Sequence, residues 1–253
     1  MANMEADGAL TRKRAVENRN EAHSLLQISP WADLFQLVVR KRLCDNGWVK
    51  MRTHLTPAIA SLNYKNMSNS KQCGSIVQGQ VGKGRKFFEF KEDAPARKEL
   101  MRIVSDRLFT VGFIFFVICT HTHTHTHTRT QGVANASEVE YGRCGAIFNE
   151  DGKSCEAQYQ HMDFKKGEGV CAVILAVGSG VCMHMHNTIM DMHQGDMLVI
   201  SPNYVHGGGE YDPPEQGSNG NMRMHLYVHW RGFRKFDDTT TIHHPEVRIF
   251  VYM

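Results

Sequence analysis

The chain has 253 residues, of which 42% are apolar and 22% are charged. This length and composition predict one globular domain with an appended N-terminal region, and they allow a sizeable hydrophobic core. The formal net charge is only +3, and no basic block dominates, so a nucleic-acid partner is not expected.

The first 23 residues are polar and charged, without the apolar segment of a secretory signal, and we predict a disordered tail over residues 1–23. The seven cysteines are odd in number and form no CxxC pair, which argues against a disulfide framework. An intracellular, cytoplasmic location is therefore expected. The stretch Thr11-Arg-Lys-Arg14 leaves a nuclear address open.

Residues 24–108 are predicted to form a helical and strand region that packs on the main domain. Ser29 can cap a helix and Pro30 suits its first turn, so a helix is expected from there to about Leu43. The Asn46-Gly47 pair predicts a turn, and Trp48–Arg52 a strand. Further along we predict a loop, a strand and a helix, at Asn63–Gln80, Phe87–Phe90 and Pro95–Leu108 respectively.

An unusual segment at residues 109–131 interrupts this pattern. The apolar run Leu108–Cys119 is shorter than the roughly 20 residues that a membrane-spanning helix needs, so no membrane is expected. Thr120–Thr128 alternates threonine and histidine, as a translated dinucleotide repeat would. Histidine tracts can bind metal, but we favour an insertion in the gene model that is not structured and adds nothing to the fold.

Residues 132–253 are predicted to form a β-rich core with a C-terminal extension. Its expected strands are Gly142–Phe148, Val170–Val177, Met197–Ile200 after a Gly195-Asp196 turn, a strand opening at Arg223, and Val247–Tyr252. Beyond Arg223, polar and apolar residues alternate with period two, as in a strand. Arg223, His225 and Tyr227 would then share one face and look into a cavity.

Three residues of this core have the types and spacing of a metal site. His161-Met-Asp163 and the distant His206 offer two imidazoles and one carboxylate, the facial set expected of non-haem Fe(II) oxygenases. His206 lies 43 positions after Asp163, which leaves room for about four strands. The chain could therefore wind once around a small barrel and return His206 beside His161.

With Gln158, the His-x-Asp pair, the Gly195-Asp196 turn before His206, and Arg223 in this order, the chain resembles the iron- and 2-oxoglutarate-dependent dioxygenases. The resemblance is clearest from Val133 to Trp230 and weaker over Trp31–Leu108. It implies a mainly β (α+β) protein with N-terminal helices and a double-stranded β-helix, or jelly-roll, barrel. It implies that His161, Asp163 and His206 are the catalytic iron ligands, and that Arg223 pairs with the distal carboxylate of 2-oxoglutarate.

The resemblance also implies an activity. With Fe(II), 2-oxoglutarate and O2, such an enzyme would hydroxylate a substrate and release succinate and CO2. The substrate, a small molecule or a protein side chain, is not indicated by any motif.

The sequence motifs leave two alternative functions open. Gly178, His184, His186 and Asp191 resemble the first motif of cupins, and a cupin-type barrel enzyme would bind metal through His184, His186 and His206. In that case Asp163→Ala would keep the metal and 2-oxoglutarate would not bind. In the other alternative, the chain is a non-catalytic barrel, either a binding module or the product of a faulty gene model that cannot fold.

Overall fold

The computed structural model describes thirteen stretches of the chain, and every structural statement below refers to them: residues 41–43, 45–63, 67, 73–77, 84–109, 114–118, 130–134, 139–149, 153–164, 169–186, 188–202, 204–212 and 220–231. The chain divides into two compact units, Met1–Val38 and Val39–Met253. The first unit lies outside the described residues, and with it the predicted tail and most of the predicted first helix. The predicted strand Val247–Tyr252 lies outside them too.

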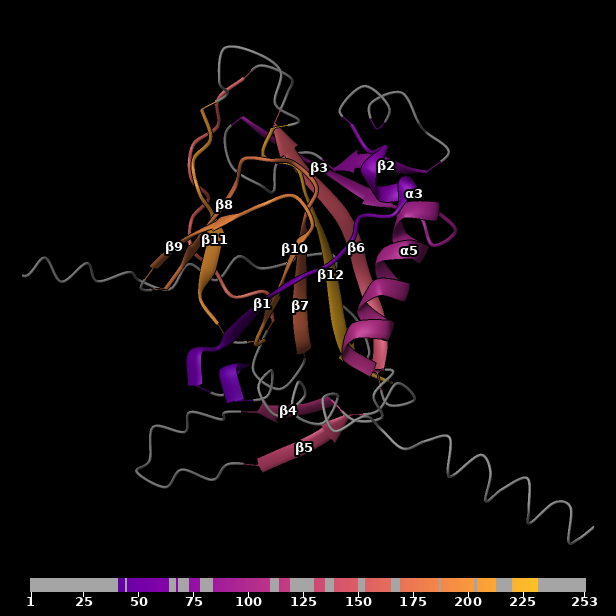
Figure 1. The fold of residues 1–253 in the computed structure, drawn as a ribbon, viewed down its shortest axis with the longest axis vertical. Coiled ribbons are helices and arrows are strands. Elements are labelled where there is room, and N and C mark those ends of the chain that lie inside the picture. The colour runs from indigo at the N-terminus through magenta and orange to yellow at the C-terminus, as the bar shows by residue number, and fades with distance from the viewer. Residues whose placement is uncertain are drawn as a thin grey trace, which may run out of the picture. The chain divides into compact units, whose positions relative to one another are not determined.

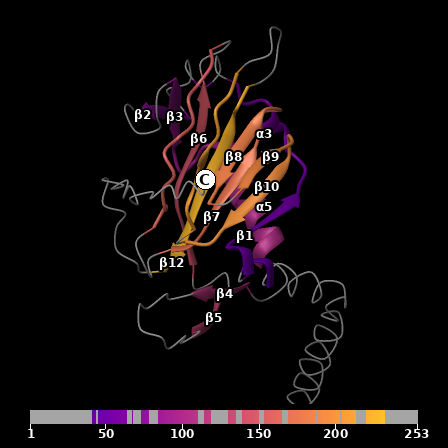
Figure 2. The same cartoon turned by 90° about the vertical axis from the view of Figure 1, so that its left-hand side faces the viewer.

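The larger sheet has seven antiparallel strands in the order β1-β10-β7-β12-β6-β3-β2 (Figure 1). Figure 2 shows its long strands β6, β12 and β7 running together. Each was predicted at least in part except β2; the bounds in sheet order are Trp48–Arg52, Asp196–Ile200, Gly169–Ala176, Arg223–Trp230, Val139–Asn149, Arg85–Phe90 and Gly74–Val77.

The smaller sheet contains β11 (His206–Gly208), β8 (Val181–Met185) and β9 (Thr188–Met192), in that order. Residues 155–161 run antiparallel along the outer edge of β11. Isolated bridges join the two ends of this segment, Cys155 to Tyr211 and His161 to His206. Successive segments thus pass between the two sheets, as in a jelly roll. The predicted mainly β fold is confirmed at this level of an antiparallel sandwich.

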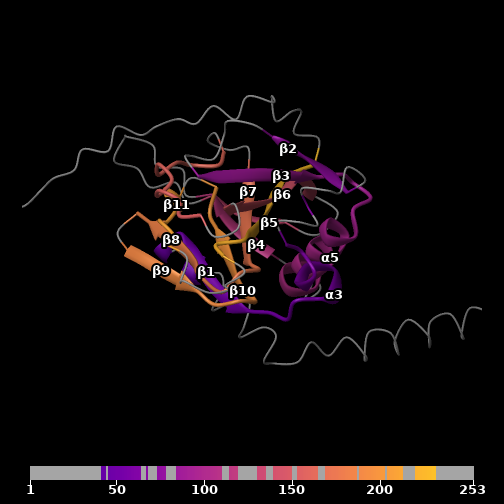
Figure 3. The same cartoon turned by 90° about the horizontal axis from the view of Figure 1, so that it is seen from above.

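The larger sheet is apolar on both faces because each face meets a different layer. Along β7, Val173 and Leu175 face one hydrophobic cluster, whereas Ala172 and Ile174 face another. Full burial of such a side chain stabilises the fold by roughly 1.5–3 kcal/mol, which explains the uninterrupted apolar sequence of this strand. Figure 3 shows helices α3 and α5 on one side of the sheet and β8, β9 and β11 on the other.

Helix α5 (Pro95–Val104) covers the first of these faces together with α3 (Pro57–Ala60). It begins with proline in its first turn, and Leu100, Ile103 and Val104 form its buried side. One π-helical turn, η1 (Ser105–Phe109), completes the predicted helix.

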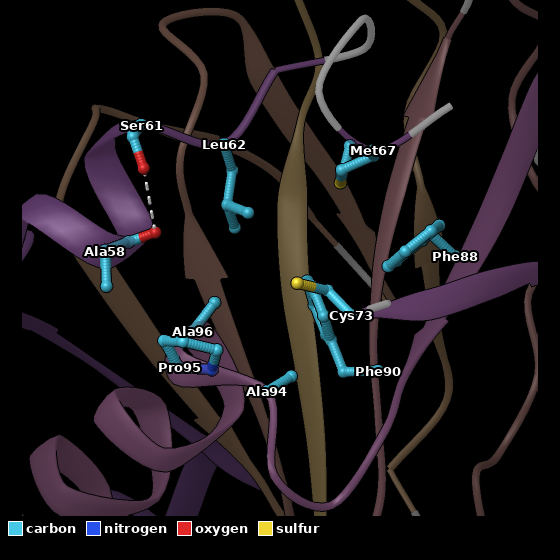
Figure 4. A pocket seen from close by; sticks show the side chains of 10 residues that line it. All are labelled: Ala58, Ser61, Leu62, Met67, Cys73, Phe88, Phe90, Ala94, Pro95 and Ala96. Carbon is cyan, nitrogen blue, oxygen red and sulfur yellow. Dashed lines mark hydrogen bonds between the residues drawn. The ribbon is translucent and has the colours of Figure 1, made fainter. Parts of the chain in front are cut away.

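A cavity of about 220 Å³ lies on this helical face. Figure 4 shows its lining, which is mostly apolar: Ala58, Ser61, Leu62, Met67, Cys73, Phe88, Phe90, Ala94, Pro95 and Ala96. None of the predicted metal or cosubstrate residues is among them. Most of its lining residues belong to, or pack against, the hydrophobic cluster on the helical face of the larger sheet.

The predicted loop Asn63–Gln80 was wrong in part, because β2 forms within it and pairs with Phe87–Phe90 of β3.

In the predicted insertion, β4 (Ile114–Ile118) pairs with β5 (Thr130–Ala134), while residues 119–129 lie outside the described residues. No helix in the part of the chain described here is both long and apolar enough to cross a membrane.

Candidate metal centre

The two histidines of the predicted triad lie opposite each other at the edge of the smaller sheet, where His161 forms an isolated bridge with His206 of β11. The backbone N–H of His161 donates to the carbonyl of His206 over 2.8 Å, and the N–H of His206 donates back over 3.0 Å. The two ring centroids are 4.9 Å apart. Four strands, β7 to β10, separate the two residues in the chain, as the spacing predicted.

Both imidazoles are held by a backbone carbonyl on one side of the ring. Nδ1 of His161 is 2.9 Å from the carbonyl oxygen of Tyr159, and Nδ1 of His206 is 3.0 Å from that of Tyr204. A carbonyl can only accept, so Nδ1 carries a proton, and in the neutral imidazole Nε2 then keeps its lone pair. This is the arrangement in which backbone contacts orient metal-binding histidines.

Asp163 completes the group from the loop after the 155–161 segment. Its Oδ2 lies 3.2 Å from Nε2 of His206, and its Oδ1 lies 3.5 Å from Nε2 of His161. Metal–ligand bonds of about 2.1 Å that meet at right angles place neighbouring ligand atoms about 3 Å apart. The ligand atoms of the three residues lie within 4.8 Å of one another, so their spacing fits one metal ion.

Two atoms of this group are buried without a hydrogen-bond partner: Oδ2 of Asp163 and Nε2 of His206. Buried polar atoms are normally satisfied, and a bound cation would satisfy both of these. The donor set, two imidazoles and one carboxylate, is the facial set of non-haem iron sites. The residues present therefore fit an iron ion.

The charges within the group also favour a cation. Burial alone would raise the pKa of Asp163, but contacts with His206 and His161 hold it well below its ordinary value. Burial alone would lower the pKa of His161, and Asp163 more than offsets this, so that the pKa is raised. The carboxylate is thus ionised, the form that binds metal.

Arg223 is buried completely at the start of β12. Its Nε donates to Nε2 of His225 over 3.2 Å, its Nη1 to Oδ1 of Asn221 over 3.1 Å, and its Nη2 to Oε1 of Gln158. Burial, followed by the nearby Arg85, lowers its pKa to about 9, so it is still a cation at neutral pH. Among the described residues, none of the ion pairs involves Arg223, although buried charges are normally paired. Its surroundings are suited to an added anion.

The polar face predicted for β12 points toward this centre. Arg223 and His225 contact each other, and the hydroxyl of Tyr227 donates to Oδ1 of Asp163 over 3.2 Å. Sequence reasoning missed Arg85, which faces the same interior. A single arginine at the start of a short strand carries no signal that would have identified it.

The structure does not bring His184 and His186 to His206. In β8, Met185 pairs with His206 and Met183 with Gly208, and both methionines are buried between the sheets. Strand alternation therefore directs His184 to the opposite face, where its Nε2 lies 3.7 Å from Oε2 of Glu210. His186 is exposed beyond the strand end. Within the described stretches, the triad is the one group of three potential ligands that is close enough for a metal.

No protein-family model matches the chain, and no curated protein sequence matches it significantly. Solved structures do match. The epimerase SnoN, in complex with Fe3+, alpha ketoglutarate and nogalamycin RO, aligns with a TM-score of 0.50 and 10% identity, covering 79% of this chain and 87% of that one. A prolyl-4-hydroxylase from Pseudomonas putida aligns with a TM-score of 0.47 and 13% identity, covering 78% and 98%. A prolyl hydroxylase from Trichoplax adhaerens aligns with a TM-score of 0.44 and 14% identity, covering 80% and 93%.

At these identities the likeness concerns the fold. The chain has the fold of SnoN, a non-heme alpha ketoglutarate dependent epimerase. The resemblance seen in the sequence is confirmed to this extent, and the buried His-Asp-His group fits an iron site.

Proposed function

We propose that the protein is a non-haem Fe(II)- and 2-oxoglutarate-dependent dioxygenase, which hydroxylates its substrate and releases succinate and CO2. One observation carries the proposal: the buried group of His161, Asp163 and His206, in which two converging ligand atoms have no hydrogen-bond partner. A facial set of three protein ligands leaves the remaining metal positions open for other molecules. The three residues would hold the iron, which when bound supplies the activation of O2 and the oxidative decarboxylation of the keto acid.

The protein's own residues have three tasks in this scheme. Asp163, held ionised, supplies the negative charge of the site. Arg223 pairs with the distal carboxylate of 2-oxoglutarate, for which the planar guanidinium of arginine is well shaped. Gln158 fixes that guanidinium, because its Oε1 accepts from both Arg223 and the backbone N–H of Gly208. The apolar side chains between the sheets exclude water from the reaction.

The assignment of 2-oxoglutarate rests on the missing counter-ion of Arg223. Three of the five N–H donors of its guanidinium are used by His225, Asn221 and Gln158, and all three partners are neutral at pH 7, since burial and then Arg223 itself hold the pKa of His225 well below its ordinary value. The cation therefore keeps both its charge and two donors for a carboxylate.

The binding test is anaerobic. Fe(II) and then 2-oxoglutarate are added to the purified protein, and the weak visible charge-transfer band of an iron-chelated keto acid is measured. We expect the band in the wild type, its loss in Asp163→Ala and its weakening in Arg223→Ala. His184→Ala is the matched control, because the proposal predicts no effect and a cupin-type site predicts loss. Folded wild-type protein that binds iron without showing the band would overturn the proposal.

The substrate is proposed to be a small molecule or a protein side chain. The fold neighbours include an epimerase and prolyl hydroxylases, so the fold does not select one substrate class. Succinate release, measured over a panel of amino acids, peptides and small metabolites, would identify the class as the one that stimulates turnover above the substrate-free rate.

A further inference from the structure

A second buried arginine faces the interior near Arg223. Arg85 opens β3 and is only 7% exposed. In the larger sheet, Phe87 pairs with Ile147, and Ile147 pairs with Arg223. Residues paired across strands share a face, as do residues two apart along a strand. Arg85, two residues from Phe87, therefore lies on the same face as Arg223.

The contacts of Arg85 leave its charge unbalanced. Its Nη1 donates to the carbonyl of Gly208 over 3.4 Å and its Nη2 to the carbonyl of Gly209. Its Nε is buried and has no partner. Among the described residues, no ion pair involves Arg85. Burial lowers its pKa, and the nearby Cys155, Cys182 and Glu210 offset this only in part. Carbonyl oxygens satisfy donors but do not neutralise a cation, and a buried charge is costly unless it is paired.

The two guanidinium groups converge on one residue, Gly208. A Cβ at this position would lie 2.1 Å from Nη2 of Arg223, and the carbonyl of the same residue accepts from Arg85. Arg85 is also close enough to lower the pKa of Arg223. Two buried cations beside each other repel, so this arrangement is suited to an anion that contacts both.

We propose that Arg85 is a second anion-recognition residue, which together with Arg223 binds the remote carboxylate of a dicarboxylic acid in the cosubstrate pocket. The identity of that acid as 2-oxoglutarate rests on the proposed function, whereas the pocket itself requires only a dicarboxylate. Arg85 and Arg223 meet at Gly208, two residues along β11 from His206. An acid bound to the triad by one end would thus meet the two cations at its other end, which would select acids with a second carboxylate over those without one.

The first test compares two keto acids that chelate iron identically. Dissociation constants of 2-oxoglutarate and 2-oxobutanoate, which lacks the remote carboxylate, are measured from the anaerobic Fe(II) band. We expect Arg85→Gln to weaken 2-oxoglutarate binding by about 10-fold or more and to leave 2-oxobutanoate unchanged, with part of the loss restored in Arg85→Lys. Arg102→Gln, an exposed arginine on α5, is the matched control. An unchanged preference for 2-oxoglutarate in Arg85→Gln would overturn the proposal. Arg85 would then have only a structural role, in which it donates hydrogen bonds to the carbonyls of Gly208 and Gly209.

The second test is independent of iron and of the dioxygenase assignment. Thermal unfolding of the metal-free protein is followed with glutarate or butyrate at constant ionic strength. We expect glutarate to raise the unfolding temperature of the wild type more than butyrate, and this difference to be lost in Arg85→Gln and Arg223→Gln. If the wild type shows no keto-acid band but retains this difference, the proposed function fails and the pocket stands. If the wild type shows no preference for glutarate, or if the preference survives in Arg85→Gln, the pocket proposal fails.

Discussion

At the scale of single residues, Tyr227 connects β12 to the metal centre. It lies on the face of β12 that holds Arg223, and its hydroxyl donates to Oδ1 of Asp163 over 3.2 Å. Burial, followed by the charge of Asp163, raises its pKa well above the ordinary value. The hydroxyl is therefore protonated throughout the physiological range and is always a donor. Oδ2 of Asp163, which has no hydrogen-bond partner, remains available to bind a cation.

We predict that Tyr227→Phe weakens metal binding by about 10–100-fold, the usual cost of losing a hydrogen bond to a ligand. The dissociation constant of Fe(II) is measured anaerobically by competition with a chromophoric chelator. Tyr141→Phe is the control, because Tyr141 packs against the cluster on the opposite, helical face of the sheet. Equal affinities in the two variants would show that Tyr227 does not hold Asp163 in its binding position.

The site residues differ in how far the sequence predicts them. His161, Asp163 and His206 follow from ligand chemistry and order, and the period of two places Arg223, His225 and Tyr227 on one face. The partners Tyr159 and Tyr204 act through backbone carbonyls, which any residue type offers. The sequence contains no signal for such contacts.

At the scale of elements, β11 approaches Arg223 so closely that only glycine fits. A Cβ on Gly208 would stand 2.1 Å from Nη2 of Arg223 and 2.7 Å from Oε1 of Gln158. We predict that Gly208→Ala displaces the guanidinium and weakens 2-oxoglutarate binding by about 10-fold or more, since a buried charge-assisted contact is lost. Fe(II) affinity serves as the internal control, because the triad keeps its own contacts. Intact 2-oxoglutarate binding in Gly208→Ala would mean that Arg223 is not the cosubstrate anchor.

The turn before β10 is held by Asp196, which follows Gly195 at φ 85°. Its carboxylate accepts from Nη1 of Arg52 and from the backbone N–H of His193, each over 2.9 Å. Burial alone would raise the pKa of Asp196, but the contact with Arg52 and then that with His193 lower it below its ordinary value. A carboxyl with a depressed folded-state pKa stabilises the fold above its unfolded-state pKa, and this contribution is lost as the pH falls through the folded-state pKa.

Asp196→Asn should therefore destabilise the protein at pH 7 by about 1 kcal/mol, or roughly 2–4 °C in unfolding temperature. The difference from the wild type should shrink as the pH falls below about 4, where the wild-type carboxyl also becomes protonated. Thermal unfolding at both pH values measures it. Asp45→Asn, which removes an exposed pair with Lys41, should cost only a few tenths of a kcal/mol. If the stability difference between the wild type and Asp196→Asn does not depend on pH, the charge of Asp196 does not stabilise the turn.

Long apolar strands and strands that follow a glycine turn could be predicted from the sequence, whereas the shortest strands could not. β7 is continuous in apolar residues and Gly195 marks the start of β10, so both were found. β2 and β11 have only four and three residues, and their pairing depends on neighbours far away in the chain. The prediction of about four strands between Asp163 and His206 succeeded because it used chain length alone.

At the scale of the whole described unit, the larger sheet separates two layers with different roles. One face carries α3, α5 and the cavity of about 220 Å³, and the other carries the triad and both buried arginines. All of these site residues come from β3, β11, β12 and residues 158–163. None comes from the Thr-His repeat, so the repeat should be dispensable for the chemistry.

The repeat can be removed with little change to its flanking strands. Ile118 of β4 pairs with Thr130 of β5, so deletion of Thr120–Thr128 leaves Cys119 and Arg129 as a two-residue connection, the commonest hairpin length. We predict that the deletion variant keeps the Fe(II)–2-oxoglutarate band of the wild type at unchanged affinity. We also predict that its divalent-metal stoichiometry, measured with Zn2+, falls below that of the wild type, because tracts of alternating histidines can bind metal. Loss of folded protein or of the band would instead make the repeat part of the functional fold, and would contradict its interpretation as an insertion.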